Sequence, residues 1–313
     1  MTNNKVKRTA LDRKLDKIRK AEESGKLGTR LTNRTLRKLT SNQLALFGFV
    51  MFFAICLVSF GAPLFTKYDP MAFDLRAKMS APSVDHLLGT DQMGRDIWTR
   101  ILYGGRISII VGLGSALGAA LVGVTLGLYM GYKGGILDGL MMKLSDIFMS
   151  IPQMVLIIIM VALVGQSLEN LIIIFIVTGW PGMYRMARSK VLSLKEQEFV
   201  QALRAFGISD VKIAFKHLLP NTLGPVVVNI TLSTAMFILQ EASLSVLGYG
   251  VPQEIATWGN IINVITNGGT IRYDYLQYWW TWVPCSLMLI LFVLAINFIG
   301  DGLRDASDPT QIG

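Results

Sequence analysis

Charged residues are scarce in this chain, and their scarcity excludes an ordinary soluble domain. They make up 16% of the 313 residues, while hydrophobic residues make up 52%, and a soluble domain usually carries about 25% charged residues. A soluble fold of this composition would leave more apolar surface exposed than monomeric soluble proteins tolerate. The composition therefore indicates a membrane protein.

Cysteine and histidine are almost absent, with two residues of each. Cys56 and Cys285 both lie in apolar runs, where cysteine behaves as a small hydrophobic residue, so a disulfide framework is excluded. The two histidines, His86 and His217, are far apart in the sequence, and the four residues together show no metal-ligand spacing.

Two signatures of enzymes are also missing. No GxxxxGKS or GxxxxGKT segment occurs, so the chain has no phosphate-binding loop of the P-loop type. No histidine stands near a candidate nucleophile, which argues against hydrolysis by covalent catalysis. We therefore expect that this chain is not an enzyme by itself and that it holds no cofactor.

The net positive charge is confined to the N-terminal arm. Residues 1–40 hold 13 of the 30 Lys and Arg residues but only four acidic residues, which accounts for the whole net charge of +9. Residues 41–313 hold 17 basic and 17 acidic residues. The high isoelectric point therefore does not indicate a nucleic-acid partner. It instead reflects a basic arm over residues 1–43 attached to a membrane-embedded body without net charge.

Charge-free stretches predict the membrane spans, since a helix needs about 20 mostly apolar residues to cross a bilayer. Five of the six stretches are long enough alone. The fourth has 15 residues and contains Pro181, so it either extends past Arg185 or forms a re-entrant segment. The sequence predicts an all-α bundle of six transmembrane helices, over Leu39–Thr66, Ile107–Tyr132, Ile147–Leu168, Asn170–Tyr184, His217–Gln240 and Tyr275–Gly300.

The distribution of Lys and Arg between the predicted loops gives the orientation. With the N-terminus in the cytoplasm, 23 basic residues lie inside and seven outside, and without the arm the numbers are still ten and seven. Because basic residues favour the cytoplasmic side, we expect a multi-pass protein with both termini in the cytoplasm.

Glycines in the second predicted span recur every four residues. Gly114 and Gly118 are one such pair, and Gly123, Gly127 and Gly131 are a triplet. This spacing puts small residues on one helix face and lets another backbone approach closely. It predicts a tight helix–helix contact, although glycine is common in membrane helices in any case.

The predicted cytoplasmic loop over residues 185–221 reads as a helix–turn–helix. Phe199, Leu203 and Phe206 are spaced to share a helical face, Gly207 is suited to end that helix, and Ser209 is suited to cap the next. Apolar side chains exposed to the cytoplasm require either a groove on a partner or a fold back onto the chain's own bundle. The periodicity alone does not decide between the two.

This loop resembles the EAA loop of permease subunits in binding-protein-dependent ABC importers. In that family the loop forms a coupling helix that docks on the ATPase subunit. Gln201 stands where the family has Glu, and Leu203 stands where it has its second Ala. The resemblance identifies as coupling residues Glu198, Gln201, Ala202, Leu203, Arg204, Ala205, Phe206, Gly207, Leu219 and Pro220.

Three further segments resemble one subfamily, the second permease subunit of oligopeptide, dipeptide and nickel importers. They are residues 241–248 with Trp258 and Gly259, residues 300–309, and an outer signature that precedes the second span. The signature residues are Gly89, Thr90, Asp91, Gly94, Arg95 and Asp96.

The resemblance implies a fold, partners and a substrate class. The expected fold is a type I ABC importer permease in a bacterial cell membrane, with its first helix and outer segment in residues 44–106 and the transporter domain in residues 107–313. The expected partners are a homologous second permease, two ATPases that bind ATP and Mg, an extracellular or periplasmic substrate-binding protein and membrane lipid. An oligopeptide is the first choice of substrate, then a dipeptide, then a nickel chelate.

Alternatives remain for the function and for the arm. A secondary transporter or channel would show ionisable residues within its spans, and this sequence offers at most Glu241. A non-transporting scaffold would leave the ordered motifs unexplained. In the arm, Leu11, Leu15 and Ile18 have helical spacing, so the arm lies on anionic lipid, touches an ATPase or stays solvated.

Polar residues near the spans are candidates for translocation or gating. Glu241 either acts in the pathway, in which case Glu241→Ala lowers transport without preventing assembly, or serves as a hydrated anchor at the outer interface, or makes a contact between helices. Asn229, Gln240 and Asn297 either line a cavity or bond neighbouring helices.

The outer signature also has two possible roles. The alternation of Asp and Arg from Asp91 to Arg100 predicts salt bridges on a short helix lying against the membrane. That helix would either meet the binding protein or form a self-contained cap.

Overall fold

The fold is described from a computed structural model, which covers residues 42–266 and 276–307. These residues form helices and connecting turns, and no strand beyond an isolated bridge between Thr90 and Asp96 occurs among them. The expected all-α fold class is confirmed. The predicted basic arm lies almost entirely outside the described residues, as do the last residues of the C-terminal motif.

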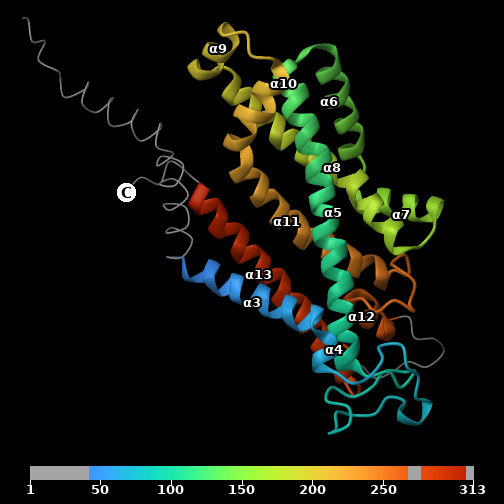
Figure 1. The fold of residues 1–313 in the computed structure, drawn as a ribbon. Helices are drawn as coiled ribbons and strands as arrows, with labels where there is room; N and C mark the ends of the chain where they lie inside the picture. The colour runs from blue at the N-terminus through green and yellow to red at the C-terminus, as the bar shows by residue number, and fades with distance from the viewer. Residues whose placement is uncertain (1–41, 267–275, 308–313) are drawn as a thin grey trace, which may run out of the picture.

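Five long helices form the body of the molecule (Figure 1). They are α3 (Gln43–Phe60), α5 (Ile97–Lys133), α8 (Leu168–Lys195), α11 (Leu219–Val246) and α13 (Val283–Ser307). The shorter helices are α4 (Ala62–Phe65), η1 (Leu75–Ala77), α6 (Gly135–Ser150), α7 (Gln153–Val164), α9 (Glu198–Ala205), α10 (Asp210–Lys212), the π-helix η2 (Ile213–Leu218), α12 (Trp258–Thr266) and η3 (Trp279–Thr281).

Polar caps mark where the first two long helices begin. The Asn42 side chain accepts hydrogen bonds from the backbone of Leu44 and Ala45 and starts α3. The Asp96 side chain accepts from the Thr99 backbone and starts α5. At about 1.5 Å per residue, the 37 residues of α5 span roughly 55 Å, well beyond the roughly 30 Å of hydrocarbon in a bilayer. α5 is therefore longer than the apolar layer is thick.

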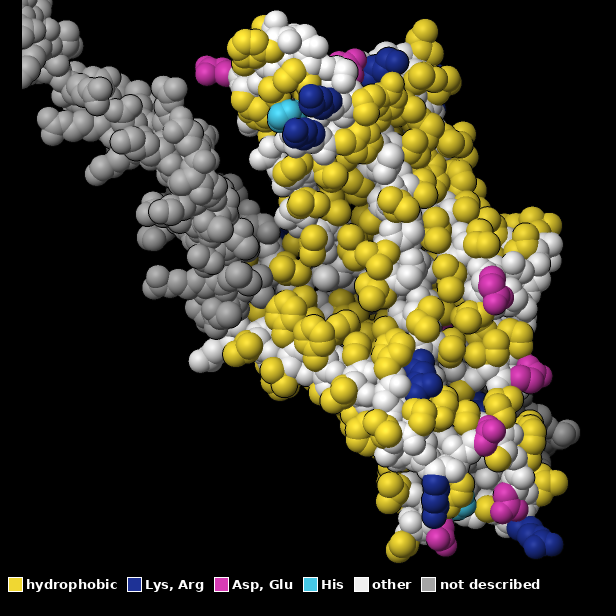
Figure 2. Space-filling view, viewed as in Figure 1, with side chains coloured by type: hydrophobic (Ala, Val, Ile, Leu, Met, Phe, Trp, Pro, Cys, Tyr) yellow, Lys and Arg dark blue, Asp and Glu magenta, His cyan; other side chains and the backbone are white. Residues whose placement is uncertain are grey.

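Within residues 42–266 and 276–307, four helices are long and apolar enough to cross a membrane, namely Gln43–Phe60, Ile97–Lys133, Asp210–Val246 and Trp279–Ala306. A fifth span results if α6 and α7, which meet at 91°, are counted as one. In Figure 2, hydrophobic side chains cover the middle of the visible face, and most charged ones lie toward the two ends.

The count of six spans stays a prediction. The structure has a break, but not in the fourth predicted stretch, for which a re-entrant segment is the alternative. The fourth predicted stretch lies within α8, a single helix of 28 residues that continues through Pro181. The third stretch, by contrast, is interrupted at Ile151 and Pro152, between α6 and α7. Proline at residue 152 lacks the N–H that would extend α6, so the chain turns there.

The predicted glycine contact is confirmed, and its partner is α8. A Cβ atom added to Gly123 would lie 2.5 Å from the Trp180 carbonyl oxygen, and one added to Gly127 would lie 2.6 Å from the Tyr184 carbonyl oxygen. A Cβ atom on Gly131 would meet Arg188. The backbones of α5 and α8 thus touch over two turns, which only glycine on α5 permits. Gly114 faces open space among the described residues, so the contact does not reach it.

Replacing Gly127 should weaken this contact. We expect Gly127→Val to destabilise the protein by about 1–3 kcal/mol, because the new methyl groups would overlap the α8 backbone. The apparent melting temperature of the purified protein in detergent measures this, with Gly114→Val as the matched control because nothing lies within 4 Å of its added Cβ. Equal melting temperatures for the two variants would contradict the packing argument.

Candidate functional site

Within the predicted loop over residues 185–221, α8 continues to Lys195 and α9 follows, and Gly207 ends α9 as predicted. Gly207 has a φ of +71°, in the left-handed region that a residue with a side chain rarely adopts. The Ile208 N–H donates to the Leu203 carbonyl over 3.2 Å, and the Gly207 N–H donates to the Arg204 carbonyl over 2.9 Å. These bonds satisfy carbonyls at the helix end and turn the chain back toward the bundle.

One face of α9 is folded onto the bundle, and the other is bare. Val200 is fully buried, in a cluster with Ile213 and Leu218, and Leu203 packs against the same cluster. Phe206 is 83% exposed, and Gln201, Ala202, Arg204 and Ala205 are exposed as well. The predicted common face of Phe199, Leu203 and Phe206 is therefore wrong, because Leu203 points inward while Phe206 stands beyond the helix end in solvent.

The second half of the loop continues directly into a membrane helix. Ser209 precedes α10 as predicted, but its side chain makes no capping hydrogen bond. The chain stays helical from Asp210 to Val246, with the π-helix η2 immediately before Leu219 and Pro220. Pro220 cannot donate a backbone hydrogen bond to the preceding turn, and the wider π geometry falls at that point.

Arg204 connects α9 to the C-terminal end of α5. Its Nε donates to the Tyr132 hydroxyl over 2.8 Å, and its guanidinium lies 4.9 Å from the centre of the Tyr132 ring. The Lys195 amine lies 6.0 Å from the same ring. Tyr132 is 2% exposed. Sequence reasoning missed this residue, since one tyrosine at the end of an apolar run carries no recognisable signal.

At the opposite end of α5, the outer signature folds as a turn and not as the predicted short helix. The Asp91 carboxylate accepts hydrogen bonds from the backbone of Met93 and Arg95, and Gly94 has a φ of +74°. A left-handed residue and a side chain bonded to the backbone two and four residues later stop a helix from forming.

The charges of this signature are paired and buried. Arg95 Nε donates to Asp91 over 2.7 Å, which confirms the salt bridge expected at four-residue spacing, and Arg100 Nε lies 3.8 Å from the same carboxylate. His86 Nδ1 is 3.0 Å from Asp96. Gly89, with a φ of +71°, and Thr90, bridged to Asp96, close the turn. The charges contact one another, which favours the self-contained cap.

Glu241 joins α11 to α12 inside the protein. Its carboxylate is fully buried and accepts hydrogen bonds from Ser245 over 3.0 Å and from Thr257 over 2.8 Å. A Cβ atom on Gly259 would lie 3.0 Å from the same carboxylate oxygen. The alternative of a hydrated outer interface is therefore wrong. The contact also explains why residues 241–248 and the Trp258–Gly259 pair form one motif.

The other polar candidates lie apart from one another. Asn229 donates to the Pro225 carbonyl of its own helix over 2.9 Å. Gln240 and Asn297 are half-buried on α11 and α13. Neither they nor Glu241 lines the cavity described next, and no cluster able to hold a metal ion occurs among the described residues.

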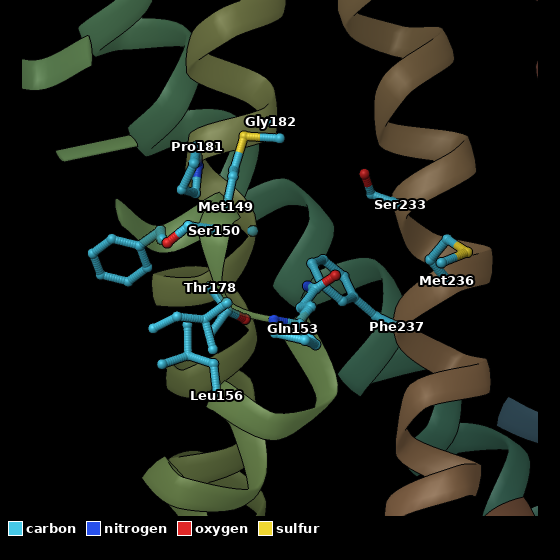
Figure 3. A pocket seen from close by; sticks show the side chains of 14 residues that line it. Met149, Ser150, Gln153, Leu156, Thr178, Pro181, Gly182, Ser233, Met236 and Phe237 are labelled. Atoms are coloured by element: carbon cyan, nitrogen blue, oxygen red, sulfur yellow. The ribbon is translucent and has the colours of Figure 1, made fainter. Parts of the chain in front are cut away.

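A cavity of about 510 Å³ lies at the break between α6 and α7 (Figure 3). α8 and α11 form its other walls, and its polar side chains are Ser150, Gln153, Thr178 and Ser233. Sequence reasoning missed this site. The available signal was the polar and proline interruption at residues 150–153 within the third apolar stretch.

Ion pairs hold α6, which forms one wall of this cavity, on α8. Arg188 donates to the Asp138 carboxylate through Nε over 2.7 Å and Nη2 over 2.6 Å, and the Tyr184 hydroxyl donates to the same group over 3.0 Å. Arg185 bonds Ser145 and Asp146. The wall formed by α6 is therefore fixed.

The burial of Glu241 predicts how its variants behave. Glu241→Ala should cost about 1–3 kcal/mol, because it leaves the Ser245 and Thr257 hydroxyls without their buried acceptor. Glu241→Gln keeps an acceptor oxygen and should cost less. Thermal unfolding in detergent measures both, with the exposed Ser243→Ala as control. An alanine variant as stable as the control would show that this contact does not hold α12.

Comparisons with known proteins agree with this geometry. Residues 123–312 match the family described as binding-protein-dependent transport system inner membrane component, and residues 31–82 match the N-terminal TM domain of oligopeptide transport permease C. The oligopeptide transport system permease protein OppC of Bacillus subtilis is 36% identical over 289 residues, which cover 92% of this chain and 93% of OppC. The dipeptide transport system permease protein DppC of Alkalihalophilus pseudofirmus is 38% identical over 273 residues, 87% of this chain and 88% of that one.

A solved structure supports the fold alone. A chain of the inward-facing MetNI methionine ABC transporter aligns with a TM-score of 0.53 and 22% identity, over 66% of this chain and 96% of the other. With a family match over more than half the chain and relatives of similar length, the assignment is plain. This chain belongs to the family of binding-protein-dependent transport system inner membrane components and is a multi-pass permease of an ABC importer.

Proposed function

We propose that this permease moves oligopeptides or dipeptides into the cytoplasm, as one of two homologous permease subunits in an ATP-driven importer. The names of OppC and DppC, which align over nearly their whole length, support the substrate class. The observation that carries the coupling role is α9, a short helix fixed to the bundle on one side and bare on the other, with Phe206 projecting from its end.

In this proposal, two ATPase subunits dock on α9 and carry the ATP and Mg. Phe206 enters a groove on the ATPase, and Gln201, Ala202 and Ala205 border the contact. Closure of the ATPases around ATP displaces α9, and the Arg204–Tyr132 contact passes that displacement to α5. Such coupling requires that the ATPases bind α9 with different free energies in the two states of the permease.

The topology follows from the same assignment. The α9 end faces the cytoplasm with both termini, and the outer signature lies on the opposite side of the membrane. A secondary transporter gains no support from the described residues. Glu241, the ionisable residue of its span, is buried, accepts two hydroxyl hydrogen bonds on one carboxylate oxygen and does not line the cavity.

Co-purification tests the assembly. A C-terminally tagged chain extracted from native membranes in mild detergent should bring with it a second permease and P-loop ATPases, identified by mass spectrometry. With Phe206→Asp, the amount of ATPase that co-purifies should fall at least tenfold, because the substitution places a charge in an apolar groove. Phe73→Asp is the matched control, because Phe73 is similarly exposed, at 63%, on the outer segment. A stable chain purified without ATPases would overturn the proposal.

Gly207 tests the coupling turn. Gly207→Val should lower ATP-dependent uptake at least tenfold by straining the left-handed turn, while Gly207→Asn should retain most of it because asparagine tolerates that conformation. Uptake of labelled peptide by proteoliposomes measures both. Gly139→Val, an exposed helical glycine with no neighbour within 4 Å, controls for the added bulk. Wild-type uptake by Gly207→Val would argue against a tight turn.

A further inference from the structure

The broken third span creates a cavity that the coupling contacts do not use. α6 ends at Ser150, α7 begins at Gln153, and the two helices meet at 91°. In Figure 1 this break lies between the α9 end of the molecule and the end that holds the outer segment. A substrate that crosses from one end to the other passes this depth.

The cavity walls carry no charge. Serine, threonine and glutamine supply the polar part, and the remaining lining residues are apolar or glycine. A charged guest would lose its hydration there without meeting a counter-charge, whereas a neutral side chain would lose little. The lining therefore favours a neutral guest.

The cavity has the size and access of a ligand site. Its volume of about 510 Å³ falls within the roughly 300–1,000 Å³ that is typical of small-molecule pockets. Met149 and Met236, which line it, are 54% and 55% exposed, so the cavity opens at the surface of the chain. Methionine walls adapt to guests of different shape.

Two polar side chains on opposite walls have hydrogen-bonding capacity to spare. Gln153 comes from α7 and Ser233 from α11 (Figure 3). Within the part of the chain that the structure describes, neither side chain is hydrogen-bonded to another residue. Ser150 and Thr178 already donate to backbone carbonyls of their own helices, over 2.8 and 2.9 Å. Gln153 and Ser233 are thus free to bond the amide groups of a peptide main chain.

We propose that the cavity at the α6–α7 break is a peptide-binding site that receives a neutral, apolar side chain of the peptide in transit. Gln153 and Ser233 bond the peptide backbone at its mouth. This inference rests on the proposed peptide transport and adds to it a selection by side-chain charge and size within the permease.

Gly182 allows the size of the cavity to be changed without disturbing the fold. It lines the cavity, and a Cβ atom added to it meets nothing within 4 Å. In proteoliposomes that contain the whole complex, Gly182→Leu should lower the uptake ratio of Ala-Trp-Ala to Ala-Ala-Ala about tenfold, the equivalent of about 1.4 kcal/mol. Gly139→Leu, on α6 but away from the cavity, should keep the wild-type ratio. Because each ratio is compared with wild type, preferences of the binding protein cancel.

A charge placed in the cavity gives a test that misfolding cannot mimic. Met236→Glu should raise the uptake ratio of Ala-Lys-Ala to Ala-Leu-Ala about tenfold relative to Met236→Gln, which has the same shape without the charge. A gain for the lysine peptide together with the size effect at Gly182 would establish the site.

The remaining outcomes overturn the inference in distinguishable ways. Unchanged ratios in both series, with normal wild-type uptake, would reject the site and leave the proposed function intact. Loss of the second permease from purified Gly182→Leu complexes would show that the cavity is a subunit contact. A wild-type complex that moves no peptide would reject the proposed function and the site together.

Discussion

The close approach of α5 and α8 is the contact on which the rest of the structure depends. Because Gly123 and Gly127 have no side chains, the two backbones touch, and the 28-residue α8 is held along the 37-residue α5. Within a membrane, the gain from such contacts is dispersion between closely packed atoms, since lipid is as apolar as the helix surfaces. α8 in turn holds α6 through the Asp138–Arg188 pair. The α6 wall of the cavity is thus positioned from α5 through α8.

α5 is also the element that both ends of the protein share. Tyr132, at one end, holds Arg204 of the cytoplasmic loop, and Asp96, at the other, caps the helix and bonds His86 of the outer segment. A helix of roughly 55 Å with backbone hydrogen bonds throughout is stiff along its axis. One continuous helix therefore joins the α9 end of the protein to the outer segment.

The sequence predicted those features that depend on local geometry. Gly207 ends α9 because the turn depends on the backbone conformation of this one residue. The glycine triplet packs against α8 because its four-residue spacing, set by the helix period, places all three glycines on one face. It failed where long-range contacts or competing local bonds decide. The outer signature has helical charge spacing, yet the bonds of Asp91 to the following backbone hold it in a turn. The buried Glu241 accepts a hydrogen bond from Thr257, which is 16 residues away in the sequence, and no local sequence pattern indicates a contact between residues so far apart. The charge-free criterion did not reveal the break in the third stretch, because neither Ile151 nor Pro152, where the chain turns, carries a charge.

The coupling site at α9 and the cavity at the α6–α7 break lie apart, and the two sites have different requirements for binding. In the proposed coupling, the binding free energy of the ATPase at α9 differs between two states of the permease, so the contact needs a defined apolar element such as Phe206 and a turn that does not relax. A site on the path has the opposite requirement, since tight binding there would hold the substrate back. A cavity with neutral walls, flexible methionines and two free polar side chains suits weak contacts to many peptides. In the proposed coupling, a movement of α9 would act on the α11 wall of the cavity, because α11 continues unbroken into the loop, while an ion pair holds the α6 wall on α8. The cavity therefore has the placement needed to change shape when the loop moves.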